Sequence, residues 1–70
     1  MISEHDRVVL TASLPKEGLE AGDIGAVVHI YPGHAAYEVE FVTLTGATAA
    51  VVTLNADQVR TVSSRDVPTL

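Results

Sequence analysis

The chain has 70 residues, no cysteine, and a formal net charge of −5 at pH 7 from nine acidic and four basic residues. This length allows a single domain at most, and a core of this size seldom supplies more than about 3–5 kcal/mol of stability. Without cysteine, disulfides and thiolate metal sites are excluded, so packing, self-association or a bound partner must stabilise the fold. The absence of thiols is also typical of a cytoplasmic protein.

Neither a membrane span nor a secretion signal is visible in the sequence. No apolar run approaches the roughly 20 residues that cross a bilayer. Residues 1–6 lack the basic stretch followed by an apolar one that marks a signal peptide. We therefore expect a cytoplasmic protein that makes no membrane contact.

The basic residues are few and scattered along the chain, at Arg7, Lys16, Arg60 and Arg65. Proteins that bind nucleic acids gain much of their affinity from Lys and Arg side chains placed together on phosphates. The charge therefore argues against DNA or RNA as a partner and favours a basic protein surface. Solubility alone is the other explanation of the negative charge.

Two strands are predicted in the first half of the chain, at residues 7–11 and 25–31, where Val and Ile are frequent. Residues 11–23 join them and are typical of a loop, because they include one proline and two glycines. Leu14 and Leu19 lie in this loop. We expect both to pack onto the core, because exposed leucines would not offset the entropy lost on ordering the loop.

A tight turn and a third strand follow. Pro32 and Gly33 suit the two central positions of a type II turn, because proline presets φ and glycine accepts a positive φ. Residues 37–42 show the clearest alternation in the chain. This pattern predicts a buried face and an exposed face, formed respectively by Tyr37, Val39 and Phe41 and by Glu38 and Glu40.

The fourth predicted strand, residues 48–54, is apolar on both faces at Ala49–Val52. A strand of this kind is covered on both sides or lies at a tight bend. One interpretation is an interface with a second copy or a partner, which would include Ala49 or Val51. The other is cover by the loop segment LPKEGLEAG, and the sequence leaves both open.

A short turn and a short strand end the predicted domain. Asn55–Asp57 is typical of one turn of 3-10 helix with Asn55 as its cap, and residues 58–62 form the fifth strand. We expect residues 63–70 to be a flexible tail. The predicted fold is all-β, a five-stranded SH3-like barrel in one domain over residues 1–62, because a flat sheet would leave an apolar face and two edges bare.

Three spaced glycines are followed by two runs of strand-forming residues. The residues of this pattern are Gly18, Leu19, Gly22, Gly25, Val27, Val28, Tyr37, Val39, Glu40 and Phe41. This order resembles a family of small bacterial proteins, domain of unknown function 4926, over roughly residues 4–62. The resemblance implies a compact SH3-like barrel with no established reaction or ligand. Members look like companions of toxin-like or nuclease-like genes, which implies an antitoxin or immunity role. Residues 32–36 look variable in the family and imply no shared role.

A second resemblance is to the KOW motif of ribosomal and transcription proteins, carried by the alternating valines and the glycines of residues 6–30. Gly22 and Gly25 are interpreted as a structural bend, because no helix N-terminus or lysine follows as a phosphate loop needs. KOW modules usually add Lys and Arg around this hairpin, so the likeness extends to the fold more than to nucleic acid. The residues found there instead are Glu17, Glu20 and Asp23.

The candidate partner-binding residues are acidic and apolar. The acidic residues of the first loop and the third strand form one negative patch if the loop folds over that strand, and such a patch would meet a basic surface. Fully solvated carboxylates are the other interpretation. With the apolar pair of the fourth strand, the candidates are Glu17, Glu20, Asp23, Glu38, Glu40, Ala49 and Val51.

No catalytic, cofactor or metal site is predicted. His5, His29 and His34 lack the regular spacing of metal ligands, although the last two could approach each other across the Pro-Gly turn. The serines have no His and Asp beside them. Paired carboxylates on the convex face of a small barrel lack the pocket that acid–base chemistry needs. We therefore expect neither enzymatic activity nor a cofactor.

The sequence as a whole favours a non-enzymatic protein-interaction module. The specific hypothesis is an antitoxin- or immunity-like partner that masks a basic toxin or nuclease. The alternative is a KOW-like module that binds RNA or the transcription or translation machinery, and a third interpretation is a self-associating structural subunit. The net charge separates the first two and favours the protein partner.

Measuring the affinity for nucleic acids tests the prediction that this negatively charged chain does not bind DNA or RNA. We expect titration with duplex DNA and with structured RNA at low salt to show only weak, non-specific contact, because no cluster of Lys or Arg is available to release counterions. The measurement is fluorescence anisotropy of the labelled nucleic acid, repeated at about 150 mM salt. A micromolar complex that survives the higher salt would support the KOW-like alternative instead.

Overall fold

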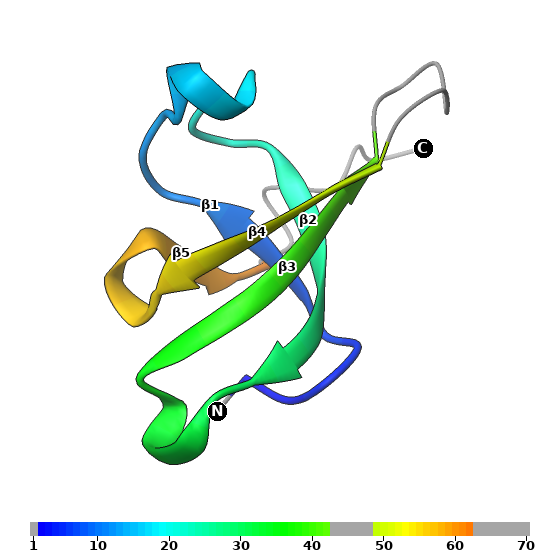
Figure 1. Cartoon of the computed structure of the whole chain (residues 1–70), viewed down its shortest axis with the longest axis vertical. Coiled ribbons are helices and arrows are strands. Elements are labelled where there is room, and N and C mark those ends of the chain that lie inside the picture. The colour runs from blue at the N-terminus through cyan, green and yellow to red at the C-terminus, as the bar shows by residue number, and fades with distance from the viewer. Residues whose placement is uncertain (1, 43–48, 63–70) are drawn as a thin grey trace.

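The structure is a computed structural model that describes residues 2–42 and 49–62. Five β-strands and three short 3-10 turns make up the described chain (Figure 1). Their bounds are β1 Arg7–Leu10, η1 Pro15–Glu17, β2 Ile24–Ile30, η2 Pro32–His34, β3 Ala36–Val42, β4 Ala49–Asn55, η3 Ala56–Gln58 and β5 Val59–Thr61. The five predicted strands are confirmed, and each end lies within one residue of the predicted end.

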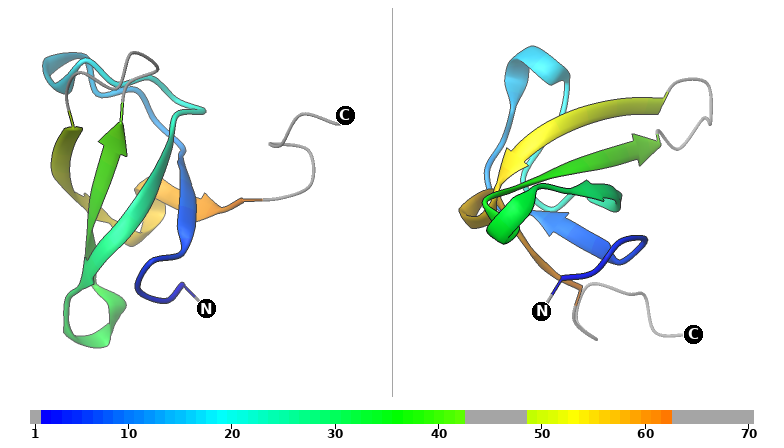
Figure 2. Two further views of the ribbon diagram at one scale, coloured as in Figure 1. Left: turned by 90° about the vertical axis from the view of Figure 1, so that its right-hand side faces the viewer. Right: turned by 60° about the horizontal axis from the view of Figure 1, so that its bottom comes forward.

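The strands form one antiparallel sheet in the order β4-β3-β2-β1-β5. This is the order of an SH3-like barrel, so the predicted all-β fold class is confirmed. The barrel is not closed by strand pairing, since β4 and β5 are the two ends of the order. The left view of Figure 2 shows β4 at the margin of the sheet, followed by β3 and β2.

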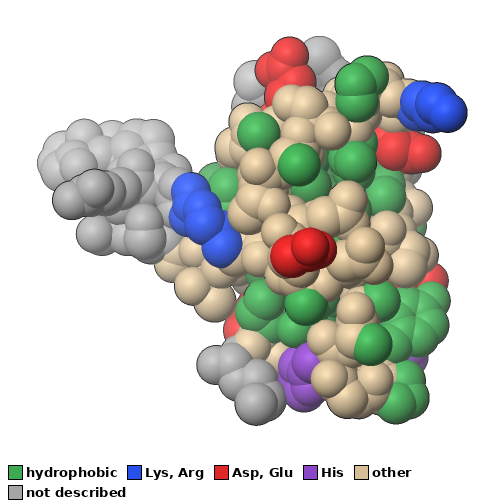
Figure 3. All heavy atoms as spheres, turned by 90° about the vertical axis from the view of Figure 1, so that its left-hand side faces the viewer, with side chains coloured by type: hydrophobic (Ala, Val, Ile, Leu, Met, Phe, Trp, Pro, Cys, Tyr) green, Lys and Arg blue, Asp and Glu red, His purple; other side chains and the backbone are tan. Residues whose placement is uncertain are grey.

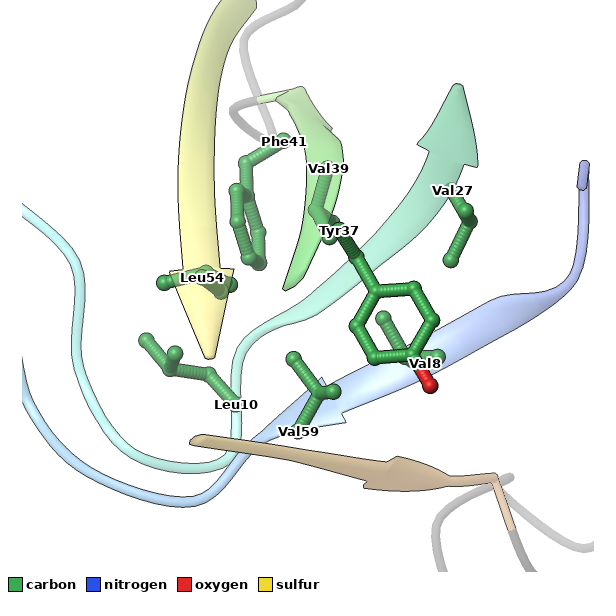
Figure 4. Close-up of a cluster of buried hydrophobic side chains, with 8 residues drawn as sticks. All are labelled: Val8, Leu10, Val27, Tyr37, Val39, Phe41, Leu54 and Val59. Atoms are coloured by element: carbon green, nitrogen blue, oxygen red, sulfur yellow. The ribbon is translucent and has the colours of Figure 1, made fainter. Parts of the chain in front are cut away.

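Alternate side chains of the strands meet on one side of the sheet and form the core. Aliphatic residues supply most of its volume, as expected for a chain without tryptophan. The apolar face predicted for residues 37–42 is confirmed, because every second side chain of β3 is buried. The cluster, which Figure 4 shows converging from all five strands, consists of Val8, Leu10, Val27, Tyr37, Val39, Phe41, Leu54 and Val59.

The long loop between β1 and β2 is closed by its own two leucines. The Leu14 N–H donates to the Leu19 carbonyl at 2.8 Å, and the Leu19 N–H donates to the Leu14 carbonyl at 3.1 Å. Both side chains pack against the core cluster, which confirms the role predicted for them. Gly18 follows η1 with φ +71°, a left-handed conformation that glycine adopts without strain.

Two turns have the chemistry that the sequence predicts. The His34 N–H donates to the Tyr31 carbonyl at 3.0 Å, and Gly33 has φ 70° and ψ 11°, as the third residue of a type II turn requires. Asn55 precedes η3 as its cap residue. Its N–H donates to Gln58 Oε1 at 2.8 Å, which is the reciprocal contact of a capping box.

Gly25 does not lie at a bend, so this part of the sequence prediction is wrong. It lies within β2, where a Cβ would stand 2.5 Å from Val39 Cγ1 and 2.9 Å from the Glu40 carbonyl oxygen. Glycine at this position therefore allows β3 to approach β2 closely. Of the two glycines predicted to form a bend, Gly22 and Gly25, only Gly22 has a positive φ, which is +98°.

Part of the sequence prediction falls outside the described residues. The expected tail, residues 63–70, and the basic side chain of Arg65 lie there. The domain boundary at residue 62 therefore stays a prediction. Within the part of the chain that the structure describes, no helix has the length and apolar character of a membrane span.

The core is so small that one large side chain decides whether the domain folds. Phe41 is buried, and we expect Phe41→Ala to lower the free energy of unfolding by about 3–5 kcal/mol, a large share of the stability of a small domain. Val42, the next residue, is exposed, so Val42→Ala is the matched control and should change stability by less than about 0.5 kcal/mol. Urea denaturation followed by circular dichroism measures both. Near-native stability of Phe41→Ala would contradict the core assignment.

Candidate protein-interaction surface

The face of the sheet turned away from the core, here called the outer face, carries a row of residues that crosses from β4 to β1. Glu40 on β3 is paired with Val51 on β4 and with Ala26 on β2, and Ala26 is paired with Arg7 on β1. Directly paired residues point to the same face of an antiparallel sheet. An acidic side chain therefore lies in the middle of this row.

A second row on the outer face is apolar. Val42 on β3 and Ile24 on β2 both have exposed side chains. The backbone of Val42 is paired with that of Ala49 on β4, and Ile24 is paired with Val9 on β1, whose own side chain is buried. Single exposed aliphatic residues are ordinary, but several on neighbouring strands form an apolar patch of the kind that marks interaction sites. The exposed fractions of the large aliphatic side chains are 61% for Val42, 56% for Val51, 40% for Ile24 and 39% for Val28.

A hollow of about 260 Å³ lies where these rows cross β1, β2 and β3. Its lining combines a guanidinium, a carboxylate and aliphatic groups, and consists of Arg7, Ile24, Gly25, Ala26, Glu40 and Val42. Glu40 is half-buried. Its carboxylate has no hydrogen bond or ion pair with any described residue.

A β-bulge between Val27 and His29 brings further polar groups to the outer face. The register shift places His29 opposite Glu38. The Tyr31 hydroxyl donates to Glu38 Oε1 at 2.8 Å, and the His29 and Tyr31 rings meet edge to face with their centroids 4.8 Å apart. The hydrogen bond to the Glu38 carboxylate raises the pKa of Tyr31 above its ordinary value, and desolvation adds to this shift.

Glu38 and Glu40 are half-buried, whereas the sequence predicts that both are exposed. The reason is that β3 is an interior strand, so side chains of β2 and β4 flank both glutamates on the outer face. The two differ in what surrounds them. Glu38 accepts the hydrogen bond of Tyr31, whereas Glu40 has no such contact with a described residue.

The acidic residues of the first loop form a separate group. Asp23 is structural, because its Oδ2 accepts the Glu20 N–H at 2.9 Å and its carbonyl accepts the Leu10 N–H at 2.8 Å. Glu17 and Glu20 are exposed. The two leucines of this loop turn to the core, which lies on the opposite side of β3 from its glutamates. The acidic candidates therefore fall into a loop group and a sheet group, and Figure 3 shows acidic side chains as separate spots on the face it presents.

β4 is an edge strand, and this explains its blurred pattern. Leu54 belongs to the core and Val52 packs against it, while Val51 points outward and is exposed. The loop segment LPKEGLEAG therefore does not cover Val51. β3 lies inside the described sheet, and β4 is at one of its two ends.

Basic and imidazole groups are dispersed over different elements. The His34 ring meets the Tyr37 ring with centroids 6.1 Å apart, whereas His29 contacts Tyr31, so these histidines face different rings. In the described part of the chain, no three of the His, Asp and Glu residues lie close enough together to hold a metal ion. The described basic residues, on β1, η1 and β5, are Arg7, Lys16 and Arg60.

The sequence analysis missed most of the apolar half of this surface. It named Ala49 and Val51 but not Ile24, Val28 and Val42, because a run of valines does not reveal which residues of other strands lie beside it. One signal was available: Val42 stands where the alternation of the third strand would place a further acidic residue.

Comparison with known proteins identifies the family of the chain. A family model described as Domain of unknown function (DUF4926) matches residues 4–61. The chain belongs to this family. The match extends over all five strands and confirms the resemblance seen in the sequence. No curated protein and no solved structure matches the chain significantly.

The contact between Tyr31 and Glu38 predicts a measurable pH dependence. The pKa of Tyr31 is raised in the folded chain, so the contact stabilises the fold below about pH 10. This contribution is lost as the pH rises through the folded-state pKa. Because Glu38→Gln removes the carboxylate, we expect it to bring the pKa of Tyr31 back toward its ordinary value.

The phenolate absorbance measures this shift in a Tyr37→Phe background, where Tyr31 is the single tyrosine. Glu40→Gln is the matched control, because Glu40 does not contact Tyr31, and it should leave the titration curve unchanged. Identical curves for Glu38→Gln and its parent would show that the contact does not form.

Proposed function

We propose that this protein is a non-enzymatic interaction module whose outer face binds a basic protein. Binding would mask the partner's basic surface, as an antitoxin or immunity protein masks a toxin or nuclease. The observation that supports the proposal is the environment of Glu40. The residue is half-buried, its carboxylate has no hydrogen bond or ion pair with a described residue, and it lies beside the exposed side chains of Val42 and Val51.

An interface that covered Glu40 would remove its carboxylate from water, which is unfavourable unless a cation or a donor satisfies the charge. A Lys or Arg side chain of a partner would do so, and the attraction strengthens as the interface excludes water. The aliphatic neighbours supply the apolar area that the centre of a protein interface needs. The outer face is therefore complementary to a surface on which a cation is surrounded by apolar groups.

The remaining acidic residues would act at longer range. The chain carries a net charge of −5, and the exposed Glu17 and Glu20 add to the field that draws in a basic protein. Salt screens this attraction beyond about 8 Å at physiological ionic strength. In this scheme the loop group governs the rate of association, and the contacts of Glu40 and Val51 govern the lifetime of the complex.

The lining of the hollow supports a binding role over a catalytic one. Its polar side chains are one guanidinium and one carboxylate, from Arg7 and Glu40. Nucleophilic catalysis needs a nucleophile within reach of a base, and this lining offers neither a serine nor a histidine. An ion pair across the interface is the chemistry that these groups can perform.

Capture from the source cell tests the proposal. We expect the immobilised wild-type chain to retain a basic polypeptide from nuclease-treated lysate, and Val51→Lys to weaken its binding about tenfold or more, because the added cation would face the cations of the partner. Thr61→Lys is the matched control, because Thr61 is an exposed residue at the opposite end of the sheet. Retention that is equal for both variants, or that requires nucleic acid, would contradict the proposal.

A further inference from the structure

Resting on the proposed function, we propose that the basic partner binds as an extended segment that adds a strand to the free edge of β4, with a Lys or Arg side chain placed against Glu40. Two observations carry this inference. The edge of β4 lacks the features that normally prevent strand addition, and an unpaired carboxylate lies one strand inside that edge.

The two edges of the described sheet differ in how they are protected. β4 pairs with β3 along all seven of its residues, and no described strand pairs with its other side. Its sequence, Ala49–Asn55, has no charged residue and no proline, which are the usual protection of an edge. β5 at the other end has only three residues and includes Arg60. Strand addition is therefore favoured at β4.

Glu40 determines the chemistry of the segment that adds. A strand paired with β4 lies about 5 Å from it and about 10 Å from β3, and the residue opposite Val51 shares the outer face with Glu40. A long basic side chain at that position can lay its aliphatic stem over Val51 and bring its charge to the carboxylate. This one basic side chain of the partner would then cover Val51 and form an ion pair with Glu40.

A second copy of the chain is a poorer occupant of this edge. Two chains joined through β4 would offer each other uncharged strands, so both Glu40 carboxylates would stay unpaired. The association would also bring together two molecules with a net charge of −5 each, which repel one another. Charge complementarity therefore favours a basic segment of another protein.

Synthetic peptides test strand addition without knowledge of the partner. The probe is a fluorescent peptide of about seven residues, the length of β4, that alternates valine and lysine. One matched peptide replaces lysine by glutamate, and another carries N-methyl groups on the amides that would face β4. We expect the lysine peptide to bind at least about fivefold more tightly than the glutamate peptide, with NMR shifts in the amides of residues 49–55. The N-methylated peptide should not bind.

Charge reversal supplies the matched variant. In Glu40→Lys, the preference should invert, so that the glutamate peptide binds more tightly than the lysine peptide by a similar factor. Thr61→Lys introduces the same charge at an exposed residue of β5 and should keep the preference of the wild type. An unchanged preference in Glu40→Lys would overturn the role of Glu40.

Other outcomes overturn strand addition itself. Binding that survives N-methylation, or that leaves residues 49–55 unshifted, would place the peptide elsewhere, and failure of every peptide to bind at millimolar concentration would also reject the proposal. A dimer in analytical ultracentrifugation that Val51→Lys abolishes would show that a second copy occupies the edge. Because lysate capture reports on the outer face independently of backbone pairing, these failures are distinguishable from failure of the proposed function.

Discussion

The register in which β3 pairs with β2 and β4 sets which side chains enter the core and which lie on the outer face. This strand alternates apolar and acidic residues, and a shift of one position would send every side chain to the opposite face. In the observed register, Phe41 reaches the core and Glu40 reaches the outer face. Gly25 permits the close approach of β2 that this register needs. The core and the candidate interaction surface are therefore two consequences of one pairing.

The outer face gives different environments to two glutamates that look equivalent in the sequence. The bulge in β2 brings His29 opposite Glu38, and the hydroxyl of Tyr31 satisfies that carboxylate. Glu40 is instead opposite Ala26, which has no side-chain donor, and no described residue forms a hydrogen bond or ion pair with its carboxylate. The same strand thus contributes one acidic residue to the stability of the hairpin and one to the proposed interface.

The size of the chain connects stability with binding. A domain of 70 residues without disulfides has a small margin of stability, and one long edge of its described sheet is unpaired. A partner that binds only the folded chain would stabilise it by mass action. In the proposed complex, an added strand would extend the sheet at its open end and cover Val51, so the interaction that performs the function would also complete the fold.

The strands and their approximate ends, the buried face of β3, the type II turn at Pro32 and the family could all be predicted from the sequence. These features depend on local periodicity and on residues with special backbone preferences, which can be read from neighbours in the chain. The folded structure was needed to show that Gly25 makes room for β3, that the Tyr31 hydroxyl donates a hydrogen bond to Glu38, and that Val51 lies beside Glu40 on an edge strand of the described sheet. Such facts depend on which strands pair and in which register, and in a sheet the residues that meet are distant in the sequence.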